Sequence, residues 1–69
     1  MVEVFKSNVE NKEYAQLLLR KLMAQYPNYQ INFDLQDCDR ILRVEGNQVE
    51  SRRIIEVVSG NGFDCQVLE

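Results

Sequence analysis

The sequence contains no histidine, no tryptophan, a single proline and only two cysteines, Cys38 and Cys65. Without histidine, the chain lacks the commonest general base and the commonest nitrogen ligand of zinc. Two cysteines are too few for a small fold built on a disulfide framework. The sequence also offers no Ser/His/Asp set and no glycine-rich phosphate loop. We therefore expect a protein that is not an enzyme and carries no cofactor.

Long apolar runs and an excess of basic charge are also missing. No run approaches the ~20 apolar residues that span a bilayer, and the first residues lack the pattern of a secretion signal. These absences predict a cytoplasmic protein with no membrane partner. Eight basic and eleven acidic residues leave a net charge of -3. Because nucleic-acid binding needs a basic surface, we expect no nucleic-acid partner.

The chain has 69 residues, which predicts a single domain over residues 1-69 with a small core. Its clearest pattern is a β-hairpin. Tyr29–Leu35 alternates polar and apolar residues, as a half-buried strand does, and Arg40–Glu45 is a second extended segment. The residues between them, Gln36–Asp39, are polar and prone to turns.

A helix pattern lies on each side of this hairpin. Lys12–Tyr26 carries apolar residues at three- and four-residue steps, with Asn11 as the expected N-cap and Pro27 as the end. After the hairpin, Asn47 is the expected cap of a second helix over Gln48–Ser59. Its predicted buried face consists of Ile54, Ile55, Val57 and Val58.

Two shorter strands complete the pattern, Val2–Ser7 before the first helix and Phe63–Val67 after the second. Gly60 and Gly62 separate the second helix from the last strand, and either can adopt a left-handed C-cap conformation. The order strand, helix, strand, strand, helix, strand predicts an α+β, ferredoxin-like βαββαβ fold. Such a fold has a four-stranded antiparallel sheet with two helices on one face, and its second and fourth strands lie at opposite edges.

Two stretches carry a family resemblance. They are Ile31–Leu35 and the run from Ile54 through Gly60-Asn61-Gly62 to Phe63. Over almost its full length the chain resembles the heavy-metal-associated (HMA) domain of copper chaperones and metal-pumping ATPases. The resemblance is to a small bacterial branch of that family that lacks the CxxC metal motif.

The resemblance implies a metal loop between the first strand and the first helix, where the family typically reads Asn-Met-x-Cys-x-x-Cys. Here the chain reads Asn8-Val9-Glu10-Asn11-Lys12-Glu13-Tyr14. Asn11 and Tyr14 stand at the positions of the two cysteines. An amide and a phenol do not replace the soft ligands that Cu(I) and Zn(II) prefer, so the resemblance implies the fold without the metal site.

An acidic cluster surrounds the hairpin turn and consists of Asp34, Asp37, Cys38 and Asp39. It reads either as a weak hard-cation site or acidic docking point, or as a solvated turn in which aspartates suit the backbone. The predicted strand order separates Cys38 from Cys65. We expect Cys65 to be a small buried hydrophobe and Cys38 to be exposed, with acidic neighbours that disfavour a thiolate.

The leading functional hypothesis is a protein–protein interaction domain that binds a protein partner or itself, through the open sheet face or an edge strand. Val2, Val4 and Ile41 are predicted to form an apolar patch on the open face, flanked by Lys6 and Arg43. The alternative is a residual metal-handling protein that uses Cys38, Cys65 or carboxylates. A third reading, an RNA-recognition domain, requires aromatic residues on both central strands, and only Phe5 fits.

Overall fold

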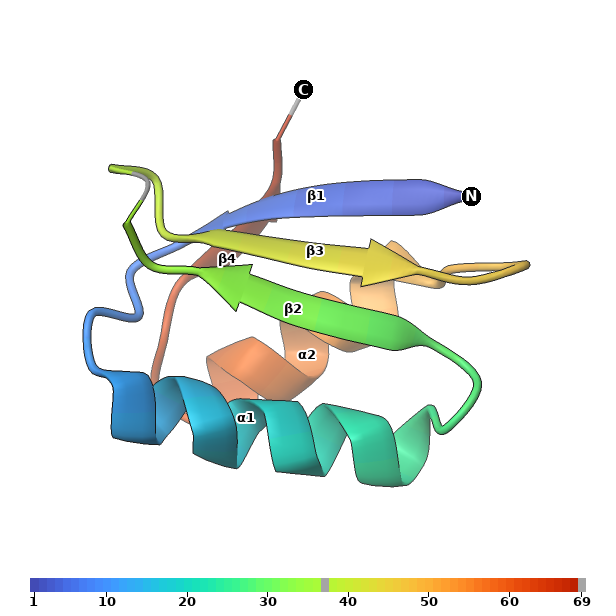
Figure 1. Ribbon diagram of the computed structural model, residues 1–69, viewed down its shortest axis with the longest axis horizontal. Helices are drawn as coiled ribbons and strands as arrows, with labels where there is room; N and C mark the ends of the chain where they lie inside the picture. Colours follow the sequence, from blue (N-terminus) through green and yellow to red (C-terminus); the bar gives the residue numbers. More distant parts are fainter. Residues whose placement is uncertain (37, 69) are drawn as a thin grey trace.

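The structure is a computed structural model that describes residues 1–36 and 38–68. The elements along the chain are β1 (Val2–Ser7), α1 (Lys12–Gln25), β2 (Gln30–Asp34), β3 (Ile41–Glu45), α2 (Ser51–Gly60) and β4 (Cys65–Val67). The four strands form one antiparallel sheet in the order β2-β3-β1-β4, and both helices lie on one face of it (Figure 1). The predicted ferredoxin-like fold is confirmed, with β2 and β4 at opposite edges.

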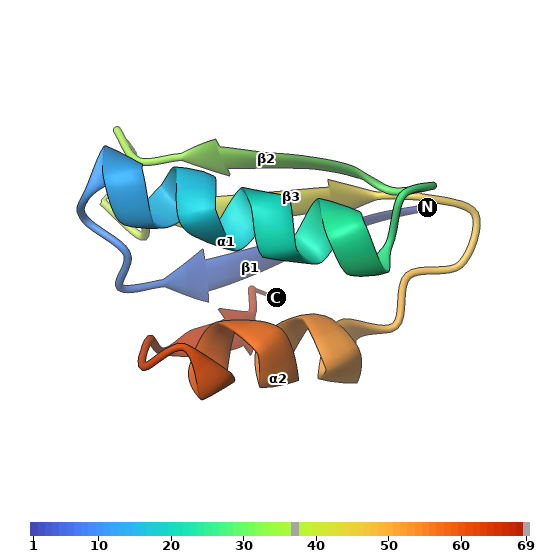
Figure 2. The ribbon, with the colours of Figure 1, turned by 90° about the horizontal axis from the view of Figure 1, so that it is seen from below.

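The two helices divide the covered face of the sheet between them. Figure 2 shows α1 running under β2 and β3, while α2 lies on the side of β1 and β4. The contacts agree, because α1 touches β2, α2 touches β4 and the helices touch each other. Each edge strand therefore has one helix beside it.

The core lies between the sheet and the helices, and the strand register builds it. Phe5 on β1 faces Leu42 on β3 and Val67 on β4, and Leu42 in turn faces Phe33 on β2. Phe5 and Leu42 are fully buried, and each such side chain contributes about 1.5–3 kcal/mol by leaving water. The remaining buried apolar residues of this cluster are Val9, Ala15, Leu18, Leu22, Ile31, Val44, Val49, Ile54 and Val58.

Helix α1 begins where the sequence predicts. The Asn11 side chain accepts a hydrogen bond from the Glu13 N–H at 2.7 Å, which satisfies one of the unpaired donors of the first turn. The helix ends at Gln25, before Pro27. The predicted cap at Asn11 is confirmed.

Helix α2 begins later than predicted, and Asn47 is not its cap. Glu50 occupies the N-cap position without a side-chain cap bond. The Tyr29 hydroxyl donates to the Gln48 carbonyl at 2.5 Å and accepts from the Glu50 N–H at 3.3 Å, while Val49 is buried. These contacts hold the chain against the start of β2, so the helix begins only at Ser51.

The strands are slightly shorter than predicted. Arg40 has a φ of 48°, outside the β region, so β3 begins at Ile41. The Asp64 N–H donates to the Asn8 side chain at 2.8 Å, and β4 begins after it, at Cys65. Gly62 has a φ of 92° and makes the left-handed turn out of α2. Within the described residues, no helix has the length and apolarity that crossing a bilayer requires.

Candidate protein-interaction surface

Structural hydrogen bonds hold the loop at which the HMA resemblance implies a metal site. Asn8 accepts from the Asp64 N–H at 2.8 Å and donates to the Asp64 carboxylate at 3.3 Å, which ties the loop to the start of β4. Asn11 caps α1, and the Tyr14 ring packs against Phe63 with their centroids 5.6 Å apart. Asn11 therefore fixes the loop to α1, and Tyr14, in the first turn of α1, contacts the segment after α2.

The other predicted metal candidates lie in or near the β2–β3 turn. Asp37 lies outside the described residues, Cys38 is exposed, and Asp34 accepts from the Gln36 N–H at 3.2 Å as aspartates in turns do. In residues 1–36 and 38–68, no three or more His, Cys, Asp or Glu side chains are grouped so as to hold a metal ion. Nothing in this arrangement favours the metal-handling alternative. The backbone carbonyl of Asp39 contributes to the fold by accepting a hydrogen bond from the Ser7 N–H at 3.0 Å.

Cys65 differs sharply from Cys38. It pairs with Ser7 at the start of β4 and is partly buried against the core. Burial raises the pKa of the Cys65 thiol from 9.0 to about 11, because the thiolate loses hydration. Cys65 is therefore a neutral thiol at physiological pH, as expected of a small hydrophobe in a strand.

The open face of the sheet carries less exposed apolar surface than predicted. The register places Val2, Val4, Ile41 and Arg43 on this face, because their neighbours Phe5, Leu42 and Val44 face the helices. Val2 is 49% exposed and Val4 is partly buried, but Ile41 is only 7% exposed. The prediction of Ile41 as an exposed patch residue is therefore wrong. Phe5 is fully buried, so it is not available to stack on an RNA base.

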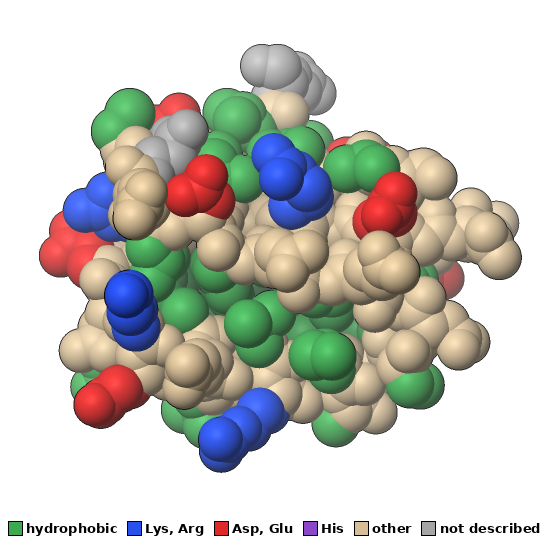
Figure 3. All heavy atoms as spheres, in the orientation of Figure 1, with side chains coloured by type: hydrophobic (Ala, Val, Ile, Leu, Met, Phe, Trp, Pro, Cys, Tyr) green, Lys and Arg blue, Asp and Glu red, His purple; other side chains and the backbone are tan. Residues whose placement is uncertain are grey.

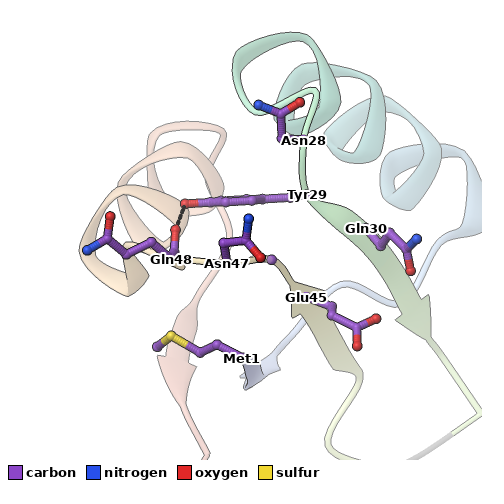
Figure 4. A pocket seen from close by; sticks show the side chains of 8 residues that line it. Met1, Asn28, Tyr29, Gln30, Glu45, Asn47 and Gln48 are labelled. Atoms are coloured by element: carbon purple, nitrogen blue, oxygen red, sulfur yellow. Dashed lines mark hydrogen bonds between the residues drawn. The ribbon is translucent and has the colours of Figure 1, made fainter.

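A polar hollow of about 500 Å³ lies where β2 begins and β3 ends (Figure 4). Tyr29 crosses it with its hydroxyl bonded to the Gln48 carbonyl, and its ring stacks on Tyr26 at a centroid distance of 5.1 Å. A Cβ at Gly46 would lie 2.6 Å from the Tyr29 ring, so only glycine fits there without a shift. The hollow is thus spanned by a side chain that anchors the start of β2.

A second and more apolar cavity is a groove between α1 and β2, of about 380 Å³. Figure 3 shows hydrophobic side chains gathered in a band between these two elements. Its apolar lining comes from Ala15 and Leu19 on α1 and from Phe33 and Leu35 at the end of β2, and Lys12 and Asp34 lie at the same end. Leu19, Phe33 and Leu35 are only partly buried, so a ligand in this groove would cover apolar surface that water now reaches.

Strand β2 forms one wall of this groove and is also an edge strand. Edge strands expose unpaired N–H and C=O groups, and proteins usually protect them with charged side chains (lysine above all), proline, a bulge or a short length. Strand β2 has five residues, Gln-Ile-Asn-Phe-Asp, and pairs with β3 in one unbroken register. It has no lysine, proline or bulge, and its one charged residue, Asp34, lies at its end. No other described strand pairs with its outer side.

No protein-family model, curated protein or solved structure matches this chain. The candidate surface, defined as β2 with the groove beside it, therefore stands on its geometry alone.

The sequence predicted that β2 would be an edge strand, but it did not predict the groove. Leu19 and Phe33 belong to the apolar sides of the predicted helix and strand, and the structure packs both against the core, yet both remain partly exposed. The available signal was the lack of lysine and proline in a strand expected at an edge.

Proposed function

We propose that the protein is a non-enzymatic interaction domain, similar to the HMA fold but without its metal cysteines, that binds an extended segment of another protein chain along β2. The observation that carries this proposal is the coincidence of an edge strand that lacks lysine, proline and a bulge with an apolar groove on its helix side. Domains that add a peptide strand to a sheet use this combination. The edge supplies main-chain hydrogen bonds, and a pocket beside it reads alternate side chains.

The binding mode follows from the period of a strand. Side chains of an added strand alternate between the two faces of the sheet. Every second side chain would enter the groove and contact Leu19 and Phe33, while the others would lie on the open face beside Asn32 and Asp34. An apolar–polar alternation is therefore the sequence pattern that the surface selects.

The expected affinity is modest. A partner strand paired with the five residues of β2 makes a small contact, below the ~1,600 Å² that stable complexes typically bury. Because β2 is already a formed strand, the domain does not have to fold when a partner strand binds. Rapid, reversible binding is the expected behaviour of such a surface.

The test is a titration of the ¹⁵N-labelled protein with capped heptapeptides that alternate valine and threonine, followed by amide NMR shifts. We expect saturable shifts at Gln30–Asp34 and along α1 near Leu19, with little change at Cys65–Val67. Shifts confined to β4 or to the open face, or no shifts at all, would contradict the proposal.

Two leucine substitutions on α1 provide a matched comparison. Leu19→Lys places a charge in the groove and is expected to weaken peptide binding at least about tenfold, because the apolar contact is lost and the charge must be desolvated. Leu17→Lys makes the same change at a residue that is 45% exposed and outside the groove lining. It should leave binding unchanged, and equal losses in both variants would place the peptide elsewhere.

A further inference from the structure

We infer that the strand that occupies the β2 edge is β2 of a second copy of this chain, paired antiparallel about a twofold axis through Asn32. The inference rests on the proposed function, because it requires that the β2 edge accept a strand. It goes further by naming the partner and the register. Asn32 is the middle residue of β2, so this axis is the one that pairs all five residues of both strands.

The register that follows is self-complementary on both faces of the joined sheet. Gln30 of each copy lies opposite Asp34 of the other, and Asn32 lies opposite itself. Ile31 lies opposite Phe33 on the helix side, where both residues already face the core. Cross-strand pairs of an aromatic with a β-branched residue, and of an amide with a carboxylate, are favourable at such positions.

Charge supports a second copy as the occupant. Asp34 is the one charged residue of β2, and in this register it meets the neutral Gln30 rather than another carboxylate. The two Asn32 side chains each offer a donor and an acceptor, so they are able to hydrogen-bond to each other. Within the paired β2 strands no like charges face each other, although the chain as a whole carries a net charge of -3.

The helix beside the strand fits the same symmetry. Lys12, Gln16, Leu19 and Met23 follow one another at three- and four-residue steps along α1, and the first three line the groove. Met23 is 51% exposed, one turn beyond Leu19. A twofold axis through β2 brings two α1 helices together antiparallel, so that Lys12 approaches the last turn of the other helix. That turn has no basic residue and carries the negative end of the helix dipole.

The test is the oligomeric state of the full chain by sedimentation, from about 10 µM to 1 mM, the range in which weak interfaces become populated. We expect a reversible monomer–dimer equilibrium. Asn32→Lys and Asn32→Asp each place two like charges face to face on the axis. Each should raise the dissociation constant at least about fivefold. An equimolar mixture of the two variants should recover the dimer, because opposite charges then meet.

Asn47→Lys is the matched control, because it makes the same change at an exposed position in the β3–α2 connection. It should dimerise as the unmodified chain does. Circular dichroism of each variant, which reports the folded state, shows whether the substitution has acted only on association.

The outcomes separate this inference from the proposed function. A chain that is monomeric up to 1 mM, or a dimer that none of the Asn32 variants changes, overturns the twofold β2 contact. If that monomer still shifts its β2 amides on addition of the heptapeptides, the interaction domain stands and its partner is a different chain. If neither occurs, both statements are wrong.

Discussion

The two edges of the sheet are built differently, although each has a helix beside it. Strand β4 has three residues, and its neighbouring segments are tied down by the Asp64–Asn8 bonds and by the Leu68 N–H, which donates to the Val4 carbonyl at 2.8 Å. Strand β2 has five residues in regular register and an apolar groove along its helix side. A short edge is one of the ways in which proteins prevent sheet-to-sheet contact. Of the two edges, β2 therefore offers the longer run of backbone to an added strand.

The segments that lead into the two edges also differ. Tyr29 holds the start of β2. Its ring stacks on Tyr26, and its hydroxyl donates to the Gln48 carbonyl and accepts from the Glu50 N–H. The start of β4 is held by the side chain of Asn8. Substitutions can therefore loosen one edge while leaving the other in place.

The largest effect is expected from Phe5→Ala, which removes the side chain that faces both β3 and β4 in the centre of the core. The loss of a fully buried phenylalanine costs about 3–5 kcal/mol of unfolding free energy. A domain of this size has little stability to spare, so both edges should be lost together. Urea unfolding by circular dichroism measures this, and a change below ~1 kcal/mol would contradict the described core.

The next effect is expected from Gly46→Ala, at the residue after β3 that packs against Tyr29. The new Cβ would lie 2.6 Å from the Tyr29 ring, which its stacking and hydrogen bonds hold in place, and we expect a loss of about 1–3 kcal/mol. Gly60→Ala is the control on the β4 side. Nothing lies within 4 Å of its Cβ, so this change should be neutral or stabilise the helix by up to about 1 kcal/mol. Thermal unfolding of the two variants gives the comparison, and equal losses would contradict it.

Smaller effects are expected from substitutions of the two asparagines in the β1–α1 loop, Asn11 and Asn8. Asn11→Ala removes the α1 cap next to the groove and should cost about 1 kcal/mol, with faster amide exchange in the first turn of α1. Asn8→Ala releases Asp64 and should raise exchange at the start of β4 instead. Native-state hydrogen exchange distinguishes the two. Asn11→Asp keeps an acceptor at the cap and should restore the exchange of α1.

The last effect arises only at alkaline pH and concerns Cys65. The pKa of the Cys65 thiol is about 11 in the folded chain and 9.0 in the unfolded chain. Between these values the unfolded state binds fewer protons, so the free energy of unfolding falls as pH rises. This loss of unfolding free energy with rising pH should be smaller in the Cys65→Ala variant. Urea unfolding below pH 9 and between pH 9 and 11 measures it. Cys38→Ala, at an exposed cysteine, is the control and should follow the unmodified chain.

Most of the fold was predictable, because period and turn chemistry specify it locally. Alternation over Tyr29–Leu35 and helical spacing over Lys12–Tyr26 led to the correct element order, and that order led to the correct edges. The start of α2 was not predictable in this way. Asn47 is a good cap by type, but the long-range bonds from Tyr29 and the burial of Val49 move the helix start to Ser51.

The candidate surface was only half predictable. Strand order identified β2 as an edge from the sequence, but a groove depends on how far α1 sits from β2. No local pattern encodes that distance. The open-face patch could not be fully predicted either. Ile41 lies on the open face, as expected, and yet it is buried. The groove and the burial of Ile41 both depend on how segments distant in the sequence pack together, which local periodicity does not specify.

The most direct test of the account is a dilution series of the ¹⁵N-labelled chain that compares the amides of β2 with those of β4. If the β2 edge is the binding surface and a second copy is its occupant, the shifts of Gln30–Asp34 will move with concentration while those of Cys65–Val67 stay fixed. Concentration-dependent shifts at Cys65–Val67 with none at Gln30–Asp34 would contradict the account and assign binding to the other edge.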